Sequence, residues 1–571
     1  MTRHIIWQTA LALLGIALTF IILFQLPPDV VPEVTVEVPA DGGTYVEGIL
    51  GFSDTINPIL APLMVPGNPV NQDLGALVFD GLTAVDKMGQ IVPSLALEWD
   101  VSEDGTTYDF HLRQDVVWHD GAPLTAADVA FTIQAMQDPG YQGDANLQDL
   151  WLNVTVYQVD DYTVRFTLEE PFPSFLYYTS IGLLPAHLLG SVPASELPSH
   201  PFSKERPVGT GRFMVETVLP DQVVLVANPS YWGPKPMLDK VAFWFYGDWE
   251  GLLEDYGQGI VHGFHPPRLE YLPTLIGMPS LELYSAQSAG YGTIYLNLTR
   301  ESLPFFQEKE VRQALLYALD RQALIDESLG GQAVIADSPI LPMSWAHDPS
   351  VRQYRYDPER AIGLLDASGW QDTDADFVRD KDDIELAFTL LTSDDPNMVR
   401  MAEQLASQWQ AVGVDTTIRS VSNEAQTTFV LNRNFDAALV EIVLSADPDP
   451  YPLWHSTQAE SGQNFSGFAS EEADMILEAG RLTADVEERA EQYRAFQHLF
   501  AEEVPSLLLY YPIYTYAVDA QVRQVQLSPL FHTSDRFRNV DQWYTETEEI
   551  VVSGDEGIVV SEDEELDKTE E

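Results

Sequence analysis

A histidine next to an aspartate can act as a general base, and the sequence contains such a pair at His119 and Asp120. A catalytic His-Asp dyad needs the two side chains to meet in space. The surrounding segment, FHLRQDVVWHDGAPLTAADVAFTI (residues 110–133), predicts a strand, an Asp-Gly turn and a helix that begins with a capping box of Thr125 and Asp128. Neighbouring residues of a strand point to opposite faces, so we expect scaffold here and no catalysis.

A second group of side chains resembles a calcium loop. Asp372, Asp374 and Asp376 match positions 1, 3 and 5 of such a loop, and Asp383 falls at position 12. Phe377 takes the place that the loop reserves for glycine, and no helix precedes the segment. An acidic surface hairpin is therefore the default expectation.

No other cluster carries a strong chemical signal. His262 and His265 lack a nearby third ligand and are interpreted as loop residues, not as a zinc or nickel pair. The motifs GxSxG and HExxH and a phosphate-binding glycine loop with lysine are absent from the sequence. We expect no enzyme activity, no metal and no cofactor.

The elements that would position a site alternate between strands and helices. Alternating apolar residues predict a strand over 384–390, and Asp395 and Pro396 then open a helix with proline in its first turn. Further strands are predicted at 241–246 and 435–443. The pattern indicates an α/β fold in several lobes.

Composition limits the function further. A chain of 571 residues is too long for one core, and its 45% hydrophobic content is that of a folded protein. Cysteine is absent, which excludes disulfides, thiolate metal sites and a lipidated N-terminal cysteine. The formal net charge of −59 repels nucleic acids and anionic lipid, so no nucleic-acid partner is expected. Such a charge could attract cationic ligands or reflect a salty habitat.

The two ends of the chain differ from the body. Residues 5–26 are almost wholly apolar and long enough to span a bilayer, and Arg3 precedes them. The positive-inside rule then leaves residues 1–4 in the cytoplasm and the body outside the cell membrane, on a single-pass transmembrane anchor. A cleaved signal peptide is the alternative. A Pro-rich tether is expected over 27–40, and a disordered acidic tail over 545–571.

Five blocks in fixed order carry a resemblance to a known family. They are residues 75–133, which include DGTTYDFHLR and WHDGAPLTAADVAF, then PVGTGRF (207–213), NPSYWGPKPMLDKV (228–241), VRQALLYALDRQALI (311–325) and LLDASGW (364–370). The blocks resemble the family 5 extracytoplasmic solute-binding proteins, which are receptors of ABC importers for oligopeptides, dipeptides or nickel.

The resemblance implies a periplasmic-binding-protein-like α/β fold of type II, cluster C, with three lobes of which the two large ones close on a ligand. Its template assigns the residues to lobes as follows: lobe I, 41–56, 205–295 and 505–544; lobe II, an insertion of residues 57–204; and lobe III, 296–504. A monomer is expected, with ABC permease subunits and a peptide or other small solute as partners.

The resemblance also implies a ligand site. Asp447 stands where peptide-binding relatives hold the ligand's α-ammonium, and Val443, Leu444 and Ser445 would pair with an extended peptide through their backbone. The alternative for Asp447 is a cap on a rigid DPDP turn. Tyr45 is expected near the cleft.

Aromatic side chains and one missing cation complete the expected site. Trp454 either stacks on the ligand or packs the lobe. Dipeptide receptors carry an arginine near the position of Thr392, and none occurs here, so a strict dipeptide receptor is not expected. An oligosaccharide receptor of the same fold, or a ligand sensor or chaperone without transport, remain the alternatives.

Overall fold

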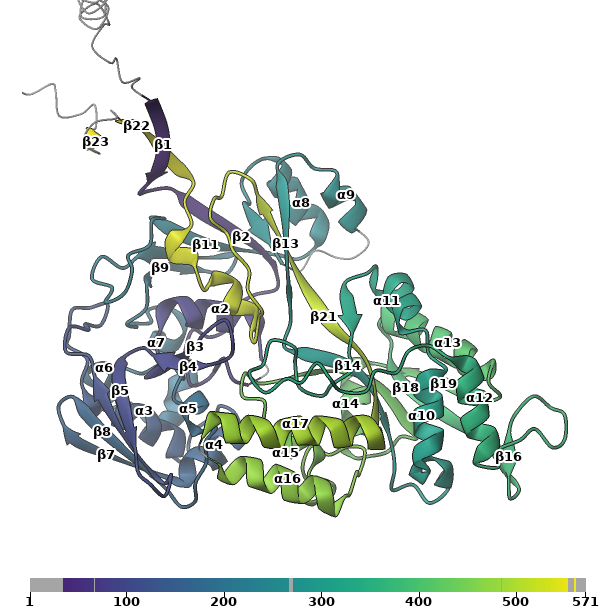
Figure 1. Cartoon of the computed structure of the whole chain (residues 1–571). Helices are drawn as coiled ribbons and strands as arrows, with labels where there is room; N and C mark the ends of the chain where they lie inside the picture. The colour runs from purple at the N-terminus through teal and green to yellow at the C-terminus, as the bar shows by residue number, and fades with distance from the viewer. Residues whose placement is uncertain (1–33, 66, 266–270, 484, 553–558, 561–571) are drawn as a thin grey trace, which may run out of the picture. The chain divides into compact units, whose positions relative to one another are not determined.

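The computed structural model describes residues 34–65, 67–265, 271–483, 485–552 and 559–560 (Figure 1). The chain divides into two compact units, residues 44–543 and the paired ends formed by residues 1–43 and 544–571. The predicted span at residues 5–26 lies outside the described residues. Among the described helices, none combines the length and the apolar composition needed to cross a membrane.

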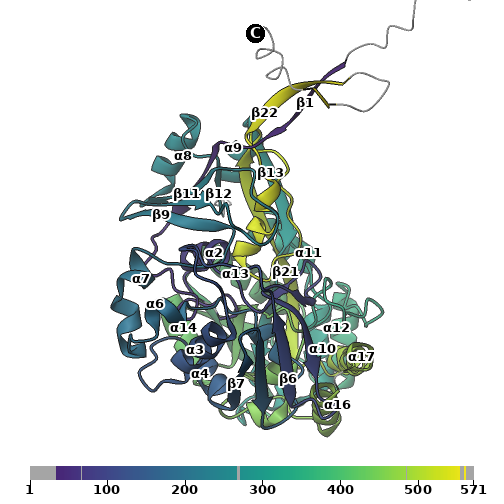
Figure 2. The same cartoon turned by 90° about the vertical axis from the view of Figure 1, so that its left-hand side faces the viewer.

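The unit of the chain ends contains a β-ribbon. Strand β1 (Val34–Ala40) pairs antiparallel with β22 (Glu546–Val552), and β22 pairs with β23 (Val559–Val560), as Figure 2 shows for β1 and β22. The disorder expected over 545–571 is therefore wrong for residues 546–552 and 559–560, and the part of the expected Pro-rich tether from Val34 to Ala40 is a strand, while its role as a tether stays a prediction. Both β1 and β22 contain β-branched valine or isoleucine, which favours strand pairing over an acidic coil.

The body is built on one large sheet with the strand order β19-β18-β20-β14-β21-β12-β2-β11-β10-β9. The strands of its first part are β2 (Thr44–Leu50), β9 (Phe213–Leu219), β10 (Gln222–Ala227), β11 (Lys240–Tyr246), β12 (Gly263–Phe264) and β13 (Leu281–Gln287). Helices α8 (Trp249–Gly257) and α9 (Leu272–Ile276) belong to the same part of the chain.

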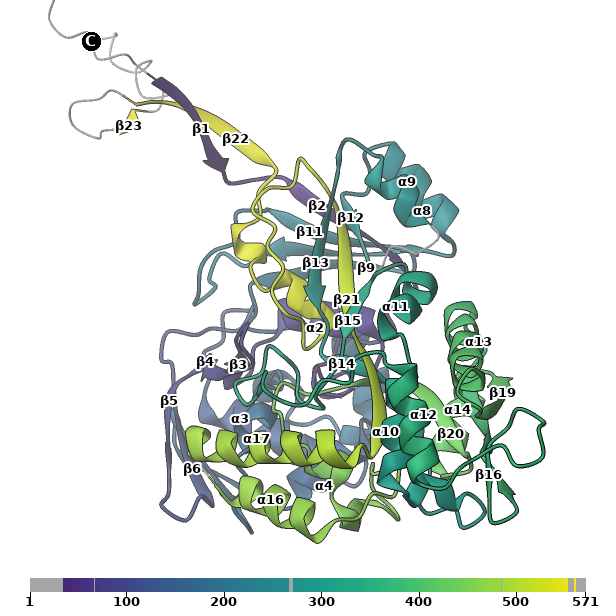
Figure 3. The same ribbon diagram turned by 45° about the vertical axis from the view of Figure 1, so that its right-hand side comes forward.

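The distal part of the sheet contains β14 (Gly290–Leu296), β15 (Ala333–Ile335), β18 (Ala387–Ser393), β19 (Asp415–Val421) and β20 (Ala437–Val443). The short strands β16 (Asp380–Lys381) and β17 (Ile384–Glu385) form a separate hairpin. The helices of this lobe are α10 (Lys309–Tyr317), α11 (Arg321–Leu329), α12 (Pro358–Ala367), α13 (Pro396–Gln410), α14 (Asn423–Leu431), α15 (Tyr451–Trp454), α16 (Glu471–Leu482) and α17 (Val486–Glu503). Figures 1 and 3 both show α16 and α17 side by side.

Strand β21 (Ser506–Asp519) belongs to both parts of the sheet. Its first half pairs with β14 and β15, and its second half pairs with β12 and β13. The chain crosses between the two parts again between β13 and β14. Strand β14, assigned to lobe I from the sequence, pairs with β20 and so lies with the distal strands.

Lobe II has a sheet of its own, in the order β5-β6-β8-β7. The strands of this sheet are β5 (Ala96–Val101), β6 (Thr107–Leu112), β7 (Val154–Asp160) and β8 (Thr163–Leu168), and β3 (Thr83–Val85) and β4 (Ile91–Pro93) form a separate hairpin. The helices of lobe II are α2 (Pro69–Val78), α3 (Ala126–Gln137), α4 (Ala145–Leu152), α5 (Phe175–Tyr178), α6 (Ala186–Leu189) and α7 (Pro201–Lys204).

Helix termini form where the sequence predicts them. Thr125 and Asp128 make the expected capping box of α3. Asp395 caps α13 by accepting hydrogen bonds from the amides of Asn397 and Met398, and the apolar face of α13 is buried in the distal core at Leu405. In both helices a polar side chain at the N-terminus satisfies backbone amides that lack a partner within the helix, while one face of the helix packs inward.

His119 and Asp120 make separate structural contacts. His119 accepts a hydrogen bond from the Gly209 amide through Nδ1 (3.1 Å) and donates one from Nε2 to the Gly211 carbonyl (3.0 Å). Asp120 pairs instead with His187, with 2.8 Å between Oδ2 and Nε2. His119 therefore ties the turn of lobe II to the segment that re-enters lobe I, as a neutral imidazole.

Acid should weaken this tie. Burial lowers the pKa of His119 from 6.5 to about 4, so the unfolded chain binds a proton more readily than the folded chain between these pH values. Stability should then fall as the pH drops from about 6.5 to 4, by about 3 kcal/mol from this residue alone. Thermal unfolding midpoints measured from pH 8 to pH 4 should fall less steeply in His119→Gln. Parallel curves for the two proteins would contradict the assignment.

Candidate ligand-binding site

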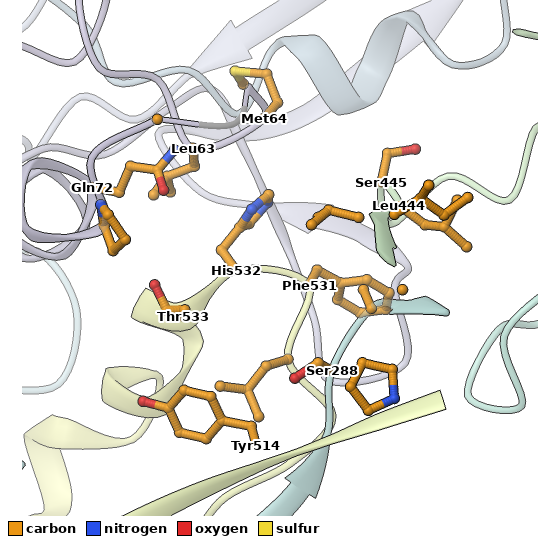
Figure 4. A pocket seen from close by; sticks show the side chains of 18 of the residues that line it. Leu63, Met64, Gln72, Ser288, Leu444, Ser445, Tyr514, Phe531, His532 and Thr533 are labelled. Atoms are coloured by element: carbon orange, nitrogen blue, oxygen red, sulfur yellow. The ribbon is translucent and has the colours of Figure 1, made fainter. Parts of the chain in front are cut away.

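A cavity of about 470 Å³ opens where β14, β20 and β21 meet the loops of lobes I and II. Figure 4 shows Phe531 and His532 between Leu63 and Gln72 on one side and Leu444 and Ser445 on the other. The lining segments, which come from distant parts of the chain, are Leu63–Val65, Gly67, Pro69, Gln72, Tyr177, His265, Ser288–Gly290, Glu441–Ser445, Pro512–Tyr514 and Leu530–Thr533.

The end of β20 presents an unpaired backbone edge at this cavity. The amide of Leu444 donates to the carbonyl of Ala289 at 3.1 Å, which makes this couple a hydrogen-bonded pair of the antiparallel ladder with β14. Alternation along such a ladder directs the amide and carbonyl groups of Glu441 and Val443 to the opposite edge. In the described part of the chain, β18 pairs with that edge only at Ala437 and Ala438.

One wall of the cavity combines aromatic and histidine side chains. The ring of His265 stacks on Tyr514 at a centroid distance of 3.6 Å, and His265 Nδ1 donates to the carbonyl of Thr515. His532 Nε2 is hydrogen-bonded to the hydroxyl of Tyr177 at 3.1 Å. Burial lowers the pKa of both histidines, so both are neutral at neutral pH. The wall offers stacking faces and uncharged polar groups.

Glu441 is the acidic residue among the described residues that line the cavity, and no lysine or arginine is among them. Its pKa is raised, first by desolvation and then by the nearby charge of Asp395, while a hydrogen bond from Tyr510 opposes the rise. Glu441 is exposed to the solvent that enters the cavity, so desolvation here reflects a crowded wall and not full burial.

The sequence-predicted site residues separate into two groups. Val443, Leu444 and Ser445 line the cavity as expected positions of ligand contact, although their ligand role itself stays a prediction. Tyr45 is fully buried, with its hydroxyl hydrogen-bonded to Glu47 and Tyr516. Trp454 is also buried and packs edge-on against Phe500. Both rings fill cores, so the packing alternative describes Trp454, and the ligand roles of Tyr45 and Trp454 stay predictions that their burial does not favour.

Asp447 does not line the cavity and pairs with a cation of the protein itself. Arg489 of α17 donates from Nη2 to Oδ1 (2.7 Å) and from Nη1 to Oδ2 (2.9 Å) of Asp447, and Nη2 also reaches Ser174 Oγ in lobe II (3.1 Å). The side chain of Arg489 is 6% exposed and that of Asp447 15%. A ligand ammonium could reach this carboxylate only in competition with Arg489. The ammonium role of Asp447 stays a prediction, and its position does not favour it.

A fully buried charge cluster lies beside the site. Arg536 donates to Glu47 Oε1 (3.0 Å) and to both oxygens of Asp73 (2.8 and 2.6 Å). Desolvation and the charge of Glu47 raise the pKa of Asp73 to about 6 against the opposing effect of Arg536. The cluster joins β2 of lobe I to α2 of lobe II. Asp73 and Arg536 also border a smaller cavity of about 360 Å³ that shares Pro69, His265 and Thr533 with the larger one.

The aspartates of the candidate calcium loop gather at the surface. The carboxylates of Asp372, Asp374 and Asp376 are exposed and lie within 4.8 Å of one another. Asp372 accepts hydrogen bonds from the amides of Ala375 and Phe377, so it closes the loop on itself. His262 Nδ1 accepts the amide of Val46, and His265 faces the cavity wall as described.

Sequence reasoning missed the residues that give the cavity its chemistry. Glu441 could have been found as an acidic residue within the otherwise apolar run AALVEIV. His265 and His532 carry no comparable signal, because their place in the cavity depends on contacts between segments far apart in the sequence.

Comparison with known proteins identifies the family. The family model described as "Bacterial extracellular solute-binding proteins, family 5 Middle" matches residues 90–464. The oligopeptide-binding protein AppA of Bacillus subtilis is 28% identical over 515 residues, which cover 89% of this chain and 92% of that protein.

Two solved structures extend the comparison. The structure of AppA from B. subtilis in complex with a nonapeptide has a TM-score of 0.68 and 27% identity and covers 89% of this chain and 99% of that chain. The structure of NikZ from Campylobacter jejuni in complex with Ni(L-His) has a TM-score of 0.70 and 26% identity and covers 89% of this chain and 100% of that chain.

Proposed function

Because the chain belongs to the bacterial extracellular solute-binding proteins of family 5, we propose that it captures a peptide in the cavity at the end of β20 and delivers it to the permease of an ABC importer. The similarity to an oligopeptide-binding protein over most of both chains supports a peptide as the ligand. Capture needs no covalent chemistry, so the protein acts as a receptor and not as an enzyme.

The unpaired edge at Glu441 and Val443 is the observation that carries this proposal. It offers two amide and two carbonyl groups to an extended ligand, and only a peptide backbone repeats the complementary groups at the spacing of a strand. The exposed side chain of Val443 and the neighbouring wall of Phe531 and Tyr514 would contact alternate ligand side chains.

The absence of a cation from the described lining residues supports a peptide longer than two residues. The carboxylate of a dipeptide would lie inside the cavity without a partner, which costs several kcal/mol. Thr392, which stands where dipeptide receptors carry arginine, is itself fully buried. A longer peptide can place its C-terminus outside the cavity.

Delivery would depend on lobe closure. The cavity is lined by lobe II on one side and by the distal strands on the other, and the segments that connect the large lobes, Ser288–Gly290 and Pro512–Tyr514, line it too. A ligand that touches all of them binds the closed state more tightly than the open one, and this difference is what shifts the equilibrium. The receptor would act as a monomer.

The attachment to the membrane is a separate part of the proposal. The apolar run at residues 5–26, with Arg3 before it, supports an uncleaved single-pass anchor that holds the body outside the cell. N-terminal sequencing of membrane-extracted protein distinguishes the anchor from a cleaved signal.

Backbone methylation of the ligand should reveal the strand edge. In a series of pentapeptides with one N-methyl group each, methylation of an amide that donates to a carbonyl of Glu441 or Val443 should weaken binding about 5- to 150-fold. Methylation of the next amide along the peptide should have little effect, because that amide points away from β20. Isothermal titration of the full-length protein measures both.

Two outcomes would contradict the peptide proposal. Equal effects at all positions would mean that the ligand backbone does not pair with β20. Binding of a neutral oligosaccharide, with no affinity for any pentapeptide, would show that the ligand of the cavity is not a peptide.

A further inference from the structure

The cavity has an uncompensated negative charge. Glu441 provides a carboxylate, the two lining histidines are neutral, and the described lining residues include no lysine or arginine. Asp395 at the start of α13 adds a second negative charge close to Glu441. The hydroxyl of Tyr510, which lowers the pKa of Glu441, is neutral and brings no positive charge.

The position of Glu441 would bring this charge to a bound ligand. Glu441 precedes Val443 by two residues in β20, so the backbone groups of both point to the same strand edge, and both residues line the cavity. A ligand strand that pairs with this edge places one of its residues directly beside Glu441, where cross-strand neighbours have Cβ atoms about 4.5–5.5 Å apart. An ammonium or guanidinium group is within reach of the carboxylate at that distance.

The energetics favour a cationic partner over a neutral one. The Glu441 carboxylate is held in a crowded wall next to a like charge, and a bound cation would relieve both penalties. A ligand carboxylate at the same place would meet two negative charges. The formal charge of −59 over the whole chain also raises the local concentration of cations.

We propose that Glu441 is the charge-selecting residue of the cavity and that the preferred ligand places a positive charge, an α-ammonium or a basic side chain, against it. The inference rests on the proposed capture of peptides and adds the class of peptide. Glu441 then acts as a specificity-determining residue.

Four pentapeptides, two variants of Glu441 and one control variant test the proposal. The peptides are penta-alanine amide with a free amino group, its N-acetylated form, an N-acetylated form with one central lysine, and an N-acetylated form with one central glutamate. Isothermal titration with the full-length protein should give about 10- to 100-fold tighter binding for one or both cationic peptides than for the neutral one. The preference between the first and third peptides distinguishes an α-ammonium from a basic side chain.

Glu441→Gln keeps the size of the side chain and removes its charge. The substitution should abolish the preference for cationic peptides and leave the affinity for the neutral peptide within about threefold. Removing the charge of Glu441 and removing the charge of the peptide delete the same interaction, so their effects should not add. Glu441→Lys should favour the glutamate peptide. Glu385→Gln, an exposed glutamate of β17 in the same lobe, is the matched control and should retain the wild-type preference.

The outcomes separate this inference from the function on which it rests. Equal wild-type affinity for neutral and cationic peptides, or a preference that survives in Glu441→Gln, overturns charge selection and leaves peptide capture intact. Failure of all four peptides to bind the wild type overturns both. Unchanged thermal unfolding of Glu441→Gln confirms that lost selectivity is not lost folding.

Discussion

Arg536→Met should lower the free energy of unfolding by about 3–5 kcal/mol at neutral pH, because it leaves two buried carboxylates without their cation. Glu47 and Asp73 are 0% and 2% exposed, and Arg536 supplies the charge-assisted hydrogen bonds that hold both. Urea unfolding and thermal unfolding of the full-length protein measure the loss.

The pH dependence of this variant identifies the cause. Without Arg536 the pKa of Asp73, already about 6, should rise further, and a carboxyl whose pKa is higher in the folded chain favours folding increasingly as the pH falls. The deficit of the variant should therefore shrink between pH 7 and pH 5. Arg165→Met, which removes an exposed cross-strand pair with Asp109, is the control and should change the unfolding midpoint little. A deficit that is the same at both pH values would argue for lost packing and not for unpaired charge.

Asp447→Asn should also cost about 3–5 kcal/mol of stability, with little change in peptide affinity. The substitution breaks a bidentate pair with Arg489, whose guanidinium is almost fully buried and also bonds to Ser174 of lobe II. Differential scanning calorimetry measures the loss of stability, and peptide titration on the same preparation measures the affinity. Arg494→Met, on the same helix but paired with Glu487 at the surface, is the control and should leave the unfolding midpoint nearly unchanged.

The opposite result would support the role expected from the sequence. If Asp447 holds a ligand ammonium, Asp447→Asn should weaken binding about 30-fold or more while stability holds. N-acetylation of the peptide should then hurt the wild type and hardly affect the variant. Comparison with Glu441→Gln decides which carboxylate selects the charge.

Sequence reasoning predicted local structure better than the site. The capping box at Thr125 and the helix that begins after Asp395 depend on neighbours a few residues away, so their signals lie within the segment itself. Val443 to Ser445 are expected at the site because a family pattern marks the end of that strand, and they line the cavity, although their ligand role stays a prediction. The sequence around Asp447 gives no sign of its partner, because Arg489 is distant in sequence and pairs with it only in the folded chain.

The chain ends are a second case in which a contact between distant segments decides the structure. The C-terminal segment 546–552 resembles a continuation of the acidic tail, because glutamates are interspersed there with the β-branched residues that favour a strand. Pairing with Val34–Ala40 supplies the backbone hydrogen bonds that make 546–552 a strand. The sequence of either segment does not indicate that the other is its partner. Pairing over the length of the chain is invisible to a local pattern.

The shared strand β21 also sets the order in which the protein can be made. Strands β12 and β14 both need β21 as a neighbour, yet β21 starts at Ser506, long after either has left the ribosome. At about 5–20 residues per second, β14 waits roughly 10–40 seconds for its partner. Neither half of the large sheet can close during that interval, so the nascent chain stays incompletely folded until synthesis is almost finished. A protein destined for the outside of the cell thereby remains open to export factors and chaperones for most of its synthesis.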